Sequence, residues 1–213
     1  GLVLAAAVIG SDEKQISGIT NLFTGQDRLA RFQRLYLPGF LLAMLADWLQ
    51  GPNMYTLYTS YGVDVGTLFI TGFLSSAIFG TFVGVYVDLW GRKLGCVVFC
   101  VLEIIINLLE HVPNFTTLMV GRILGGISTS LLFSAFESWM VSEHRKRGYK
   151  EEWLAKTFAL ASSGNGVVAI VAGFIAQISA DLVGDIGPFQ VAIALTVVAL
   201  VLVMCWEENY GES

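Results

Sequence analysis

The chain has 213 residues, of which 55% are hydrophobic and 14% are charged, and its formal net charge is −5. A soluble domain usually has about a quarter of its residues charged, so this composition argues against a soluble globular protein. The mean hydropathy of +0.69 and the long apolar stretches between clusters of charge instead predict a membrane protein. The net charge carries little information about partners, whereas the positions of the basic residues carry more.

The first 33 residues differ from those that follow. Residues 1–10 are apolar, and we interpret them as the tail of a truncated preceding helix. Residues 11–33 are polar to amphipathic, and we expect them to form a cytoplasmic connector.

Six predominantly apolar stretches come next, of a length suited to helices that cross a bilayer. In chain order they cover residues 35–58, 66–87, 94–109, 118–141, 157–179 and 189–206. We therefore predict an all-α membrane protein in which residues 34–206 form six transmembrane helices. Residues 207–213 would then begin a cytoplasmic linker.

The basic residues fall almost entirely between alternate stretches. Of the twelve, all but Arg122 lie before the first stretch, between the second and third, or between the fourth and the start of the fifth. Because cytoplasmic loops retain Lys and Arg, we expect loops 88–93 and 142–156 to be cytoplasmic. The protein is expected to be an integral, multi-pass protein of the cell membrane. The alternation also supports six spans, because one missed helix would scramble it.

A compact motif joins the second and third predicted helices: Gly84-x-x-x-Asp88-x-x-Gly91-Arg92-Lys93. The tight glycine turn would bring Arg92 back toward Asp88, and such a charge-paired turn could dock against another helix bundle as a conformational gate. An ordinary short basic loop is the alternative. Glu137 and Glu143, near the cytoplasmic end of the fourth stretch, could complete an ion cluster with this turn or form a fixed salt bridge.

Several polar residues lie inside predicted helices, where they normally face a bundle interior or a wet cavity. We predict that a substrate-binding core is formed by Arg122, Asp47, Gln50, Asn53 and Asn165. Arg122 is the candidate for anion contact because its guanidinium fits an oxyanion bidentately. It could instead tie helices together through backbone carbonyls and Asp47.

The acids of these helices leave more than one role open. Asp47 could hold Arg122, take up a proton that drives transport, or serve structure alone. Glu103, in the third stretch, could be a packing residue or part of a proton relay.

Other kinds of chemistry find little support. Cys96 and Cys100 are one helical turn apart, but no His or carboxylate at suitable spacing accompanies them, so we expect packing rather than a metal site. The Gly164-x-Gly166 pattern resembles a dinucleotide-binding turn, but it lies inside a predicted span with no preceding strand. We expect no catalytic residues, no metal, no cofactor and no nucleic-acid partner.

The motif at residues 84–93 resembles the signature loop of the major facilitator superfamily at every diagnostic position. Arg122-x-x-x-Gly126 resembles the second signature of that superfamily, in the expected helix. Further segments are similar to its molybdate-anion transporter branch: Ala46-Asp47-Trp48-Leu49-Gln50 with Pro52 and Tyr55, Gly121–Gly126, Phe133–Trp139, and Trp206-x-Glu208-Asn209-Tyr210.

This resemblance implies the six-helix amino-terminal half of a twelve-helix carrier that works by alternating access. The implied partners are a small solute, first of all an oxyanion such as molybdate, the lipid bilayer, and a missing carboxy-terminal six-helix half. Two alternatives keep the same fold: a non-transporting membrane sensor or assembly partner, and a carrier of sugars or drugs in which Arg122 would matter less.

Overall fold

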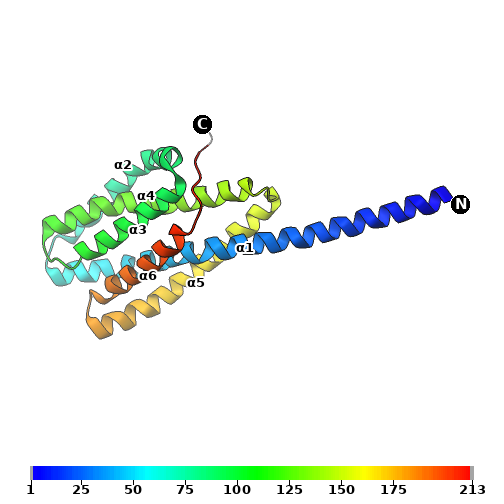
Figure 1. Ribbon diagram of the computed structural model, residues 1–213. Helices are drawn as coiled ribbons and strands as arrows, with labels where there is room; N and C mark the ends of the chain where they lie inside the picture. Colours follow the sequence, from blue (N-terminus) through cyan, green and yellow to red (C-terminus); the bar gives the residue numbers. More distant parts are fainter. Residues whose placement is uncertain (1, 212–213) are drawn as a thin grey trace. The chain divides into compact units, whose positions relative to one another are not determined.

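The computed structural model describes the backbone of residues 2–211 and the side chains of residues 24–211. This part of the chain contains no strand and six helices (Figure 1): α1 (Leu2–Tyr61), α2 (Val65–Trp90), α3 (Arg92–Leu109), α4 (Phe115–Lys146), α5 (Glu151–Val183) and α6 (Gly187–Met204). It divides into two compact units, Gly1–Tyr36 and Leu37–Ser213. Every site discussed below lies in the second unit.

The first unit is the amino-terminal part of α1. Here the backbone is helical from Leu2 onward with no break, whereas the sequence predicts a helix remnant at 1–10 and a separate connector over 11–33. A helical connector satisfies its own backbone hydrogen bonds, and residues 11–33 contain no proline, so this amphipathic stretch can continue directly into the next helix.

All six predicted apolar stretches fall in helices, although the last predicted stretch runs two residues past Met204, where α6 ends. Four of the described helices, α2, α4, α5 and α6, are long and apolar enough to cross a membrane. Helix α3 has 18 residues, as α6 has, but three of them are charged, Arg92, Lys93 and Glu103. These helices and their composition are those of an integral membrane protein.

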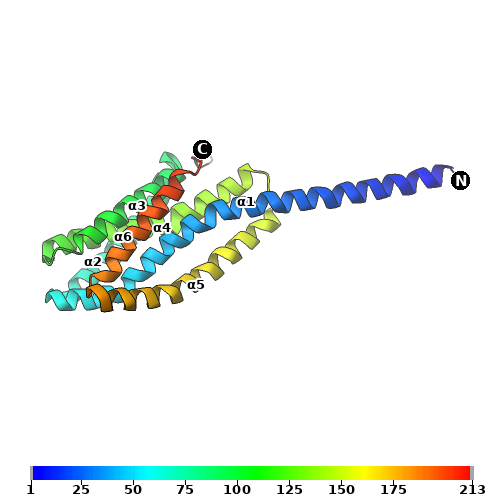
Figure 2. The same ribbon diagram turned by 60° about the horizontal axis from the view of Figure 1, so that its bottom comes forward.

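Within the second unit, α2 packs mainly on α4, α3 packs on α4 and on α6, and α6 lies between α3 and α5 (Figures 1 and 2). The part of α1 after Leu37 joins these groups. Near its end, Leu57 and Tyr58 pack with Leu68 of α2, Leu118 of α4 and Phe189 of α6. One side of α1 is therefore in contact with α2, α4 and α6 through apolar side chains.

A second apolar cluster extends these contacts to α5 through small residues. Ala46 and Leu49 of α1 pack with Ala172 and Ala176 of α5 and Ala192 of α6. Small side chains let membrane helices approach closely and gain van der Waals contact. The cluster fixes α1 between the α5–α6 side of the unit and the α2–α4 side, which positions the polar residues of α1 described below.

Helices α2 and α4 are in close contact at Gly126. A Cβ atom at this position would overlap the side chain of Ser75 and the backbone nitrogen of Ser76. The Ser75 hydroxyl also donates to the carbonyl of Ile123 at 2.6 Å. Only glycine fits this contact. Gly84, by contrast, has nothing within 4 Å of a Cβ among the residues that the structure describes.

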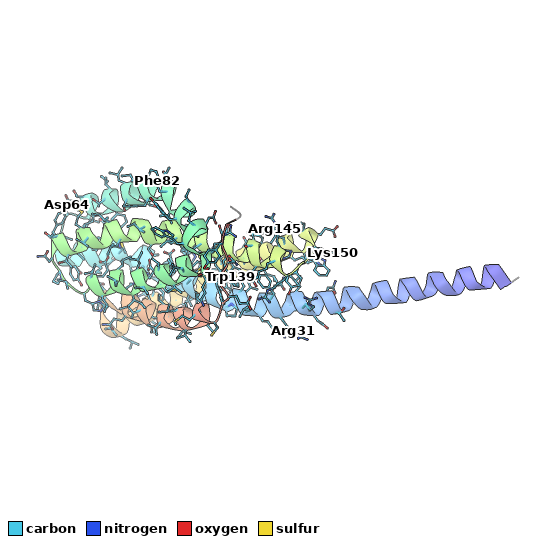
Figure 3. All side chains as sticks on the ribbon, turned by 45° about the horizontal axis from the view of Figure 1, so that its top comes forward. Arg31, Asp64, Phe82, Trp139, Arg145 and Lys150 are labelled. Atoms are coloured by element: carbon cyan, nitrogen blue, oxygen red, sulfur yellow. The ribbon has the colours of Figure 1, made fainter. Side chains whose placement is uncertain are left out.

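Figure 3 shows where labelled charged residues lie along the unit. Asp64 lies at one end, whereas Arg145 and Lys150 lie at the other, beyond Trp139. Between the ends the outer surface is apolar; Phe82 on α2 is 56% exposed and points outward. An exposed apolar belt between polar ends is typical of a protein that contacts lipid or other membrane helices.

Candidate functional site

A cavity of about 450 Å³ opens in the second unit, with its wall built by α1, α2, α3 and α4. Its polar lining residues are Asp47, Trp48 and Gln50 of α1, Ser76 of α2, Glu103 of α3, and Arg122 and Thr129 of α4. Gly72, Gly125 and Gly126 line the same cavity, and the first two lie beside Arg122, where they leave room for its side chain. The cavity is large enough for a small solute.

Three of the five predicted substrate-binding residues line this cavity: Asp47, Gln50 and Arg122. The other two do not. The Asn53 amide donates to the Leu49 carbonyl, 2.9 Å away on the same helix. Asn165 lies beside the cavity, where its Oδ1 accepts a 2.9 Å hydrogen bond from Nε1 of Trp48. Asn165 can therefore act on the cavity only through the indole that it holds.

Arg122 is paired with Glu110, an acid that directly follows the third predicted apolar stretch. Arg122 Nη2 donates to Glu110 Oε1 at 3.1 Å, and the Glu110 side chain is fully buried. The Tyr58 hydroxyl donates to the same oxygen at 2.8 Å, and the Arg122 guanidinium lies 5.8 Å from the centre of the Tyr58 ring. Arg122 is thus held at the junction of α1, α3 and α4.

The pairing of Arg122 with Glu110 was missed, although a signal existed. Glu110 directly follows α3, and α4 begins only a few residues later at Phe115. Helices joined by so short a turn are antiparallel neighbours. In the structure Gly121 of α4 lies beside Leu109 at the end of α3, so the neighbouring residues Arg122 and Glu110 can meet.

Glu103 joins three helices in this structure. Its Oε2 accepts from Nε2 of Gln50 on α1 at 2.7 Å, and its Oε1 accepts from the hydroxyl of Ser128 on α4 at 2.6 Å. The side chain is only 5% exposed. Both donors are neutral, and the carboxylate of Glu103 forms no ion pair within residues 24–211. Its contacts here are those of a residue that fixes helix positions.

Asp47 differs from the other two acids of this region. Within residues 24–211 its carboxylate has no hydrogen-bond or ion-pair partner, although it lines the cavity. The anticipated contact between Asp47 and Arg122 is absent from this arrangement, because Glu110 takes that place. Asp47 is therefore available to a solute or a proton that enters the cavity.

The predicted turn at the other end of α2 has the expected geometry. One residue, Gly91, separates α2 from α3, and its φ of 124° lies in the region that favours glycine. Arg92 Nε donates to Asp88 Oδ1 at 2.7 Å. A Cβ atom on Gly91 would come within 2.6 Å of the Glu208 carboxyl carbon. The turn is thus closed by glycine and covered by a segment from beyond α6.

That covering segment, Trp206–Gly211, is called the strap here. Both carboxylate oxygens of Glu208 accept backbone N–H groups at the start of α3, from Lys93 at 2.8 Å and from Leu94 at 3.0 Å. These amides have no partner within the helix, and an anion is favoured at a helix amino terminus. Glu208 therefore caps α3 from outside the helix.

The backbone of the strap continues these contacts on both sides of Gly91. The amide of Arg92 donates to the carbonyl of Asn209, and the amide of Gly211 donates to the carbonyl of Asp88, each at 2.9 Å. The Trp206 ring stacks on Trp139 of α4 with centroids 4.2 Å apart. Residues 207–211, expected only as the start of a linker, are thus bound to the turn. The sequence signal was the Trp206-x-Glu208-Asn209-Tyr210 segment.

The two acids predicted to join Arg92 do not pair with it. Glu143 is buried and accepts from Arg147 Nε at 2.9 Å, with Asn209 of the strap 3.3 Å from its other oxygen. Glu137 is exposed and shares a hollow of about 620 Å³ with Arg92, Arg145 and Lys146. Glu143 thus belongs to a separate ion cluster, and Glu137 faces the hollow.

Replacing Glu208 by glutamine should destabilise the cap of α3. The variant loses the charge and one acceptor, so we expect a loss of about 1–2 kcal/mol in the free energy of unfolding. Thermal unfolding in detergent measures this change. The matched control is Glu207→Gln, which removes an exposed salt bridge with Lys146 and should cost much less. Equal effects of the two variants would contradict the proposed cap.

The sequence of this chain also matches that of a known protein family. A model of the family described as sugar transporters with 12 transmembrane segments, a group of the major facilitator superfamily, matches residues 2–213. The chain belongs to the major facilitator superfamily. This membership confirms the resemblance seen at residues 84–93 and at Arg122-x-x-x-Gly126, and it places the chain among transporters and not among enzymes.

Several curated members of the superfamily match this chain, and each is named a molybdate-anion transporter. The protein of Xenopus laevis is 38% identical over 189 residues, which cover 85% of this chain and 41% of that protein. The protein of Takifugu rubripes is 36% identical over 190 residues, or 86% and 40%. That of Danio rerio is 34% identical over 184 residues, or 84% and 38%. The chain spans about two fifths of the length of these relatives.

Proposed function

We propose that this chain is the amino-terminal half of a secondary transporter that carries a small oxyanion, with molybdate as the first candidate. The observation that carries the proposal is Arg122, a guanidinium in the wall of the cavity whose Nε is buried and has no partner among the described residues. A planar guanidinium can hold two oxygens of an oxyanion at once. The names of the relatives favour molybdate.

The topology proposed with this function has six spans, formed by the later part of α1 and by α2 to α6. Basic residues collect at one end of the unit (Figure 3), and the cytoplasmic side of a membrane protein retains such residues. We therefore assign loops 88–93 and 142–156 to the cytoplasm and the protein to the cell membrane. A second six-helix half would complete the carrier.

Alternating access would use the cytoplasmic turn as its gate. The strap and the Asp88–Arg92 pair make the turn one compact body, and the hollow that contains Glu137, Arg145 and Lys146 lies beside it. A second half could pack into this hollow when the cytoplasmic side is closed and leave it when that side opens. Glu137, which is exposed there, would be free to form and break an ion pair in each cycle.

The direct test of this function is molybdate uptake by the full-length protein in cells that lack their own molybdate transporter. Saturable uptake above that of cells with an empty vector, at verified surface expression, would support the proposal. A well-expressed protein that takes up no molybdate would overturn the molybdate assignment.

Asp47 is proposed to take up the proton that accompanies the anion, since its carboxylate faces the cavity and has no partner within the described residues. Uptake should then rise as the external pH falls, and Asp47→Asn should make uptake nearly independent of pH. Initial rates between pH 5.5 and 8, on the order of the physiological range, check this. The control is Asp181→Asn, an exposed acid on α5 that pairs with Gln177. A pH profile that stays as steep in Asp47→Asn as in the unmodified protein would refute this role.

Two observations favour a second candidate, a carrier of sugars. The matching family is described as sugar transporters, and the region around the cavity has one cation for three carboxylates, Asp47, Glu103 and Glu110. Acids and amides can bind a neutral polyol through hydrogen bonds. A competition experiment distinguishes an oxyanion carrier from a sugar carrier. An excess of sugar should leave molybdate uptake unchanged if the substrate is an oxyanion.

A further inference from the structure

The ion pair between Arg122 and Glu110 is incomplete. A guanidinium and a carboxylate can form two parallel hydrogen bonds, yet only Arg122 Nη2 and Glu110 Oε1 meet, at 3.1 Å. Arg122 Nε and Glu110 Oε2 are both buried, and neither has a hydrogen-bond partner among the described residues. A buried polar atom without a partner costs free energy. The pair therefore stands in an arrangement that a better acceptor for Arg122 could displace.

Glu110 is held more firmly than Arg122. Its Oε1 accepts from the Tyr58 hydroxyl at 2.8 Å, and its backbone carbonyl accepts from the Tyr61 hydroxyl at 2.8 Å. Both tyrosines belong to α1, so Glu110 is tied to a second helix through its side chain and its backbone. Arg122 is attached by a long, flexible side chain and lines the cavity. If the pair opens, the guanidinium is the group that moves.

We propose that Glu110 is an internal competitor for Arg122, which the transported oxyanion displaces on binding and which takes Arg122 back when the anion leaves. This inference rests on the proposed function. An oxyanion in the cavity would offer oxygens to Nε and Nη2 together, and so replace one hydrogen bond by two. On release, Glu110 again partners Arg122, so the cation is never left unpaired in a poorly solvated wall.

If Glu110 exchanges with the anion at Arg122, loss of the charge on Glu110 should raise the affinity for the anion but lower the turnover. Without the charge on Glu110, the anion would meet a free guanidinium and bind more tightly. It would also leave more slowly, because no carboxylate is ready to replace it. A merely structural role for Glu110 would instead weaken binding together with turnover, since Arg122 would lose its position. Asp47 and Glu103 also face the cavity, but neither contacts Arg122 in this structure.

The first experiment compares Glu110→Gln with the unmodified full-length protein in molybdate binding and molybdate uptake. We expect the Kd to fall by at least about tenfold, because contacting opposite charges interact by several kcal/mol even at a partly solvated site. The maximal uptake rate should fall as well. Glu110→Asp, which keeps the charge, should return both quantities toward their original values, and Asp181→Asn should leave them unchanged. An unchanged or higher Kd in Glu110→Gln would overturn the proposal.

The second experiment does not depend on transport. An arginine-selective dicarbonyl reagent such as phenylglyoxal is applied to the purified protein, and modification of the Arg122 peptide is followed by mass spectrometry. Modification should be several times faster in Glu110→Gln than in the unmodified protein, and molybdate or sulfate should slow it. Glu110→Ala, which leaves no amide to pair with Arg122, takes the place of Glu110→Gln if that variant does not fold.

The two experiments separate the possible failures. If the unmodified protein takes up no molybdate but loss of Glu110 speeds labelling and an oxyanion slows it, the molybdate function falls and the exchange at Arg122 stands. If labelling does not change on loss of Glu110, the exchange is overturned whatever the uptake result. The exchange is equally overturned if no oxyanion protects Arg122.

Discussion

Arg122→Ala should reduce molybdate uptake by at least about thirtyfold at equal surface expression, since loss of one partner from a buried, hydrogen-bonded charge pair costs ~2 kcal/mol or more. The substitution removes the only cation among the residues lining the 450 Å³ cavity in the described part of the chain. Initial uptake rates measured across a range of molybdate concentrations test this. Near-normal uptake would show that transport of the anion does not depend on Arg122, and it would favour a neutral solute as the substrate.

Two further variants separate the anion contact from stability. Arg122→Lys keeps the charge but cannot form the bidentate contact, so its uptake should be intermediate. Arg122→Ala also leaves the buried Glu110 carboxylate without its cation, and that alone can lower surface expression. Combining Arg122→Ala with Glu110→Gln should therefore restore expression but not uptake.

Gly126→Val should cause the largest loss of stability among the substitutions considered. Any side chain at position 126 would overlap Ser75 and the backbone of Ser76, so α2 and α4 would have to separate along their contact. Backbone overlap cannot be relieved by rotating a side chain, and we expect a loss of about 3 kcal/mol or more. Thermal unfolding of the purified full-length protein and its surface expression provide the measurement.

The control for this substitution is Gly173→Val on α5, where a Cβ atom would meet nothing within 4 Å. It changes the same residue type to the same side chain in another apolar helix. Similar unfolding temperatures for the two variants would show that the α2–α4 contact is less tight than the structure indicates.

Local features of the sequence were enough to predict the helices and the turn between α2 and α3. Hydropathy over roughly 20 residues identifies a helix of a membrane protein because every backbone polar group must be bonded within the segment. At the turn, Gly91 and the four-residue spacing of Asp88 and Arg92 specify both the sharp change of direction and the ion pair. No distant contact is needed to infer either feature.

The partners of the polar residues could not be predicted in the same way. Asn53 resembles a cavity residue in the sequence, yet its amide is satisfied one turn back on its own helix, an option that hydropathy does not reveal. Glu110 and Glu208 lie next to helix ends, where acids are usually solvated, and their roles depend on which helices are neighbours. Sequence position suggested Asp47 as the partner of Arg122, but proximity in the fold selected Glu110.

Because α2 and α4 are in close contact at Gly126, a tilt of one helix should carry the other with it. Ser75, which touches Gly126, precedes Asp88 by thirteen positions on α2, a distance of about 20 Å along a helix. If the two helices tilt together about that contact by ~10°, the Asp88 end moves by roughly 3 Å. That shift equals the length of a hydrogen bond. If Arg122, on the partner helix, shifts when a solute binds, such a tilt would be enough to make or break the contacts between Asp88 and Arg92.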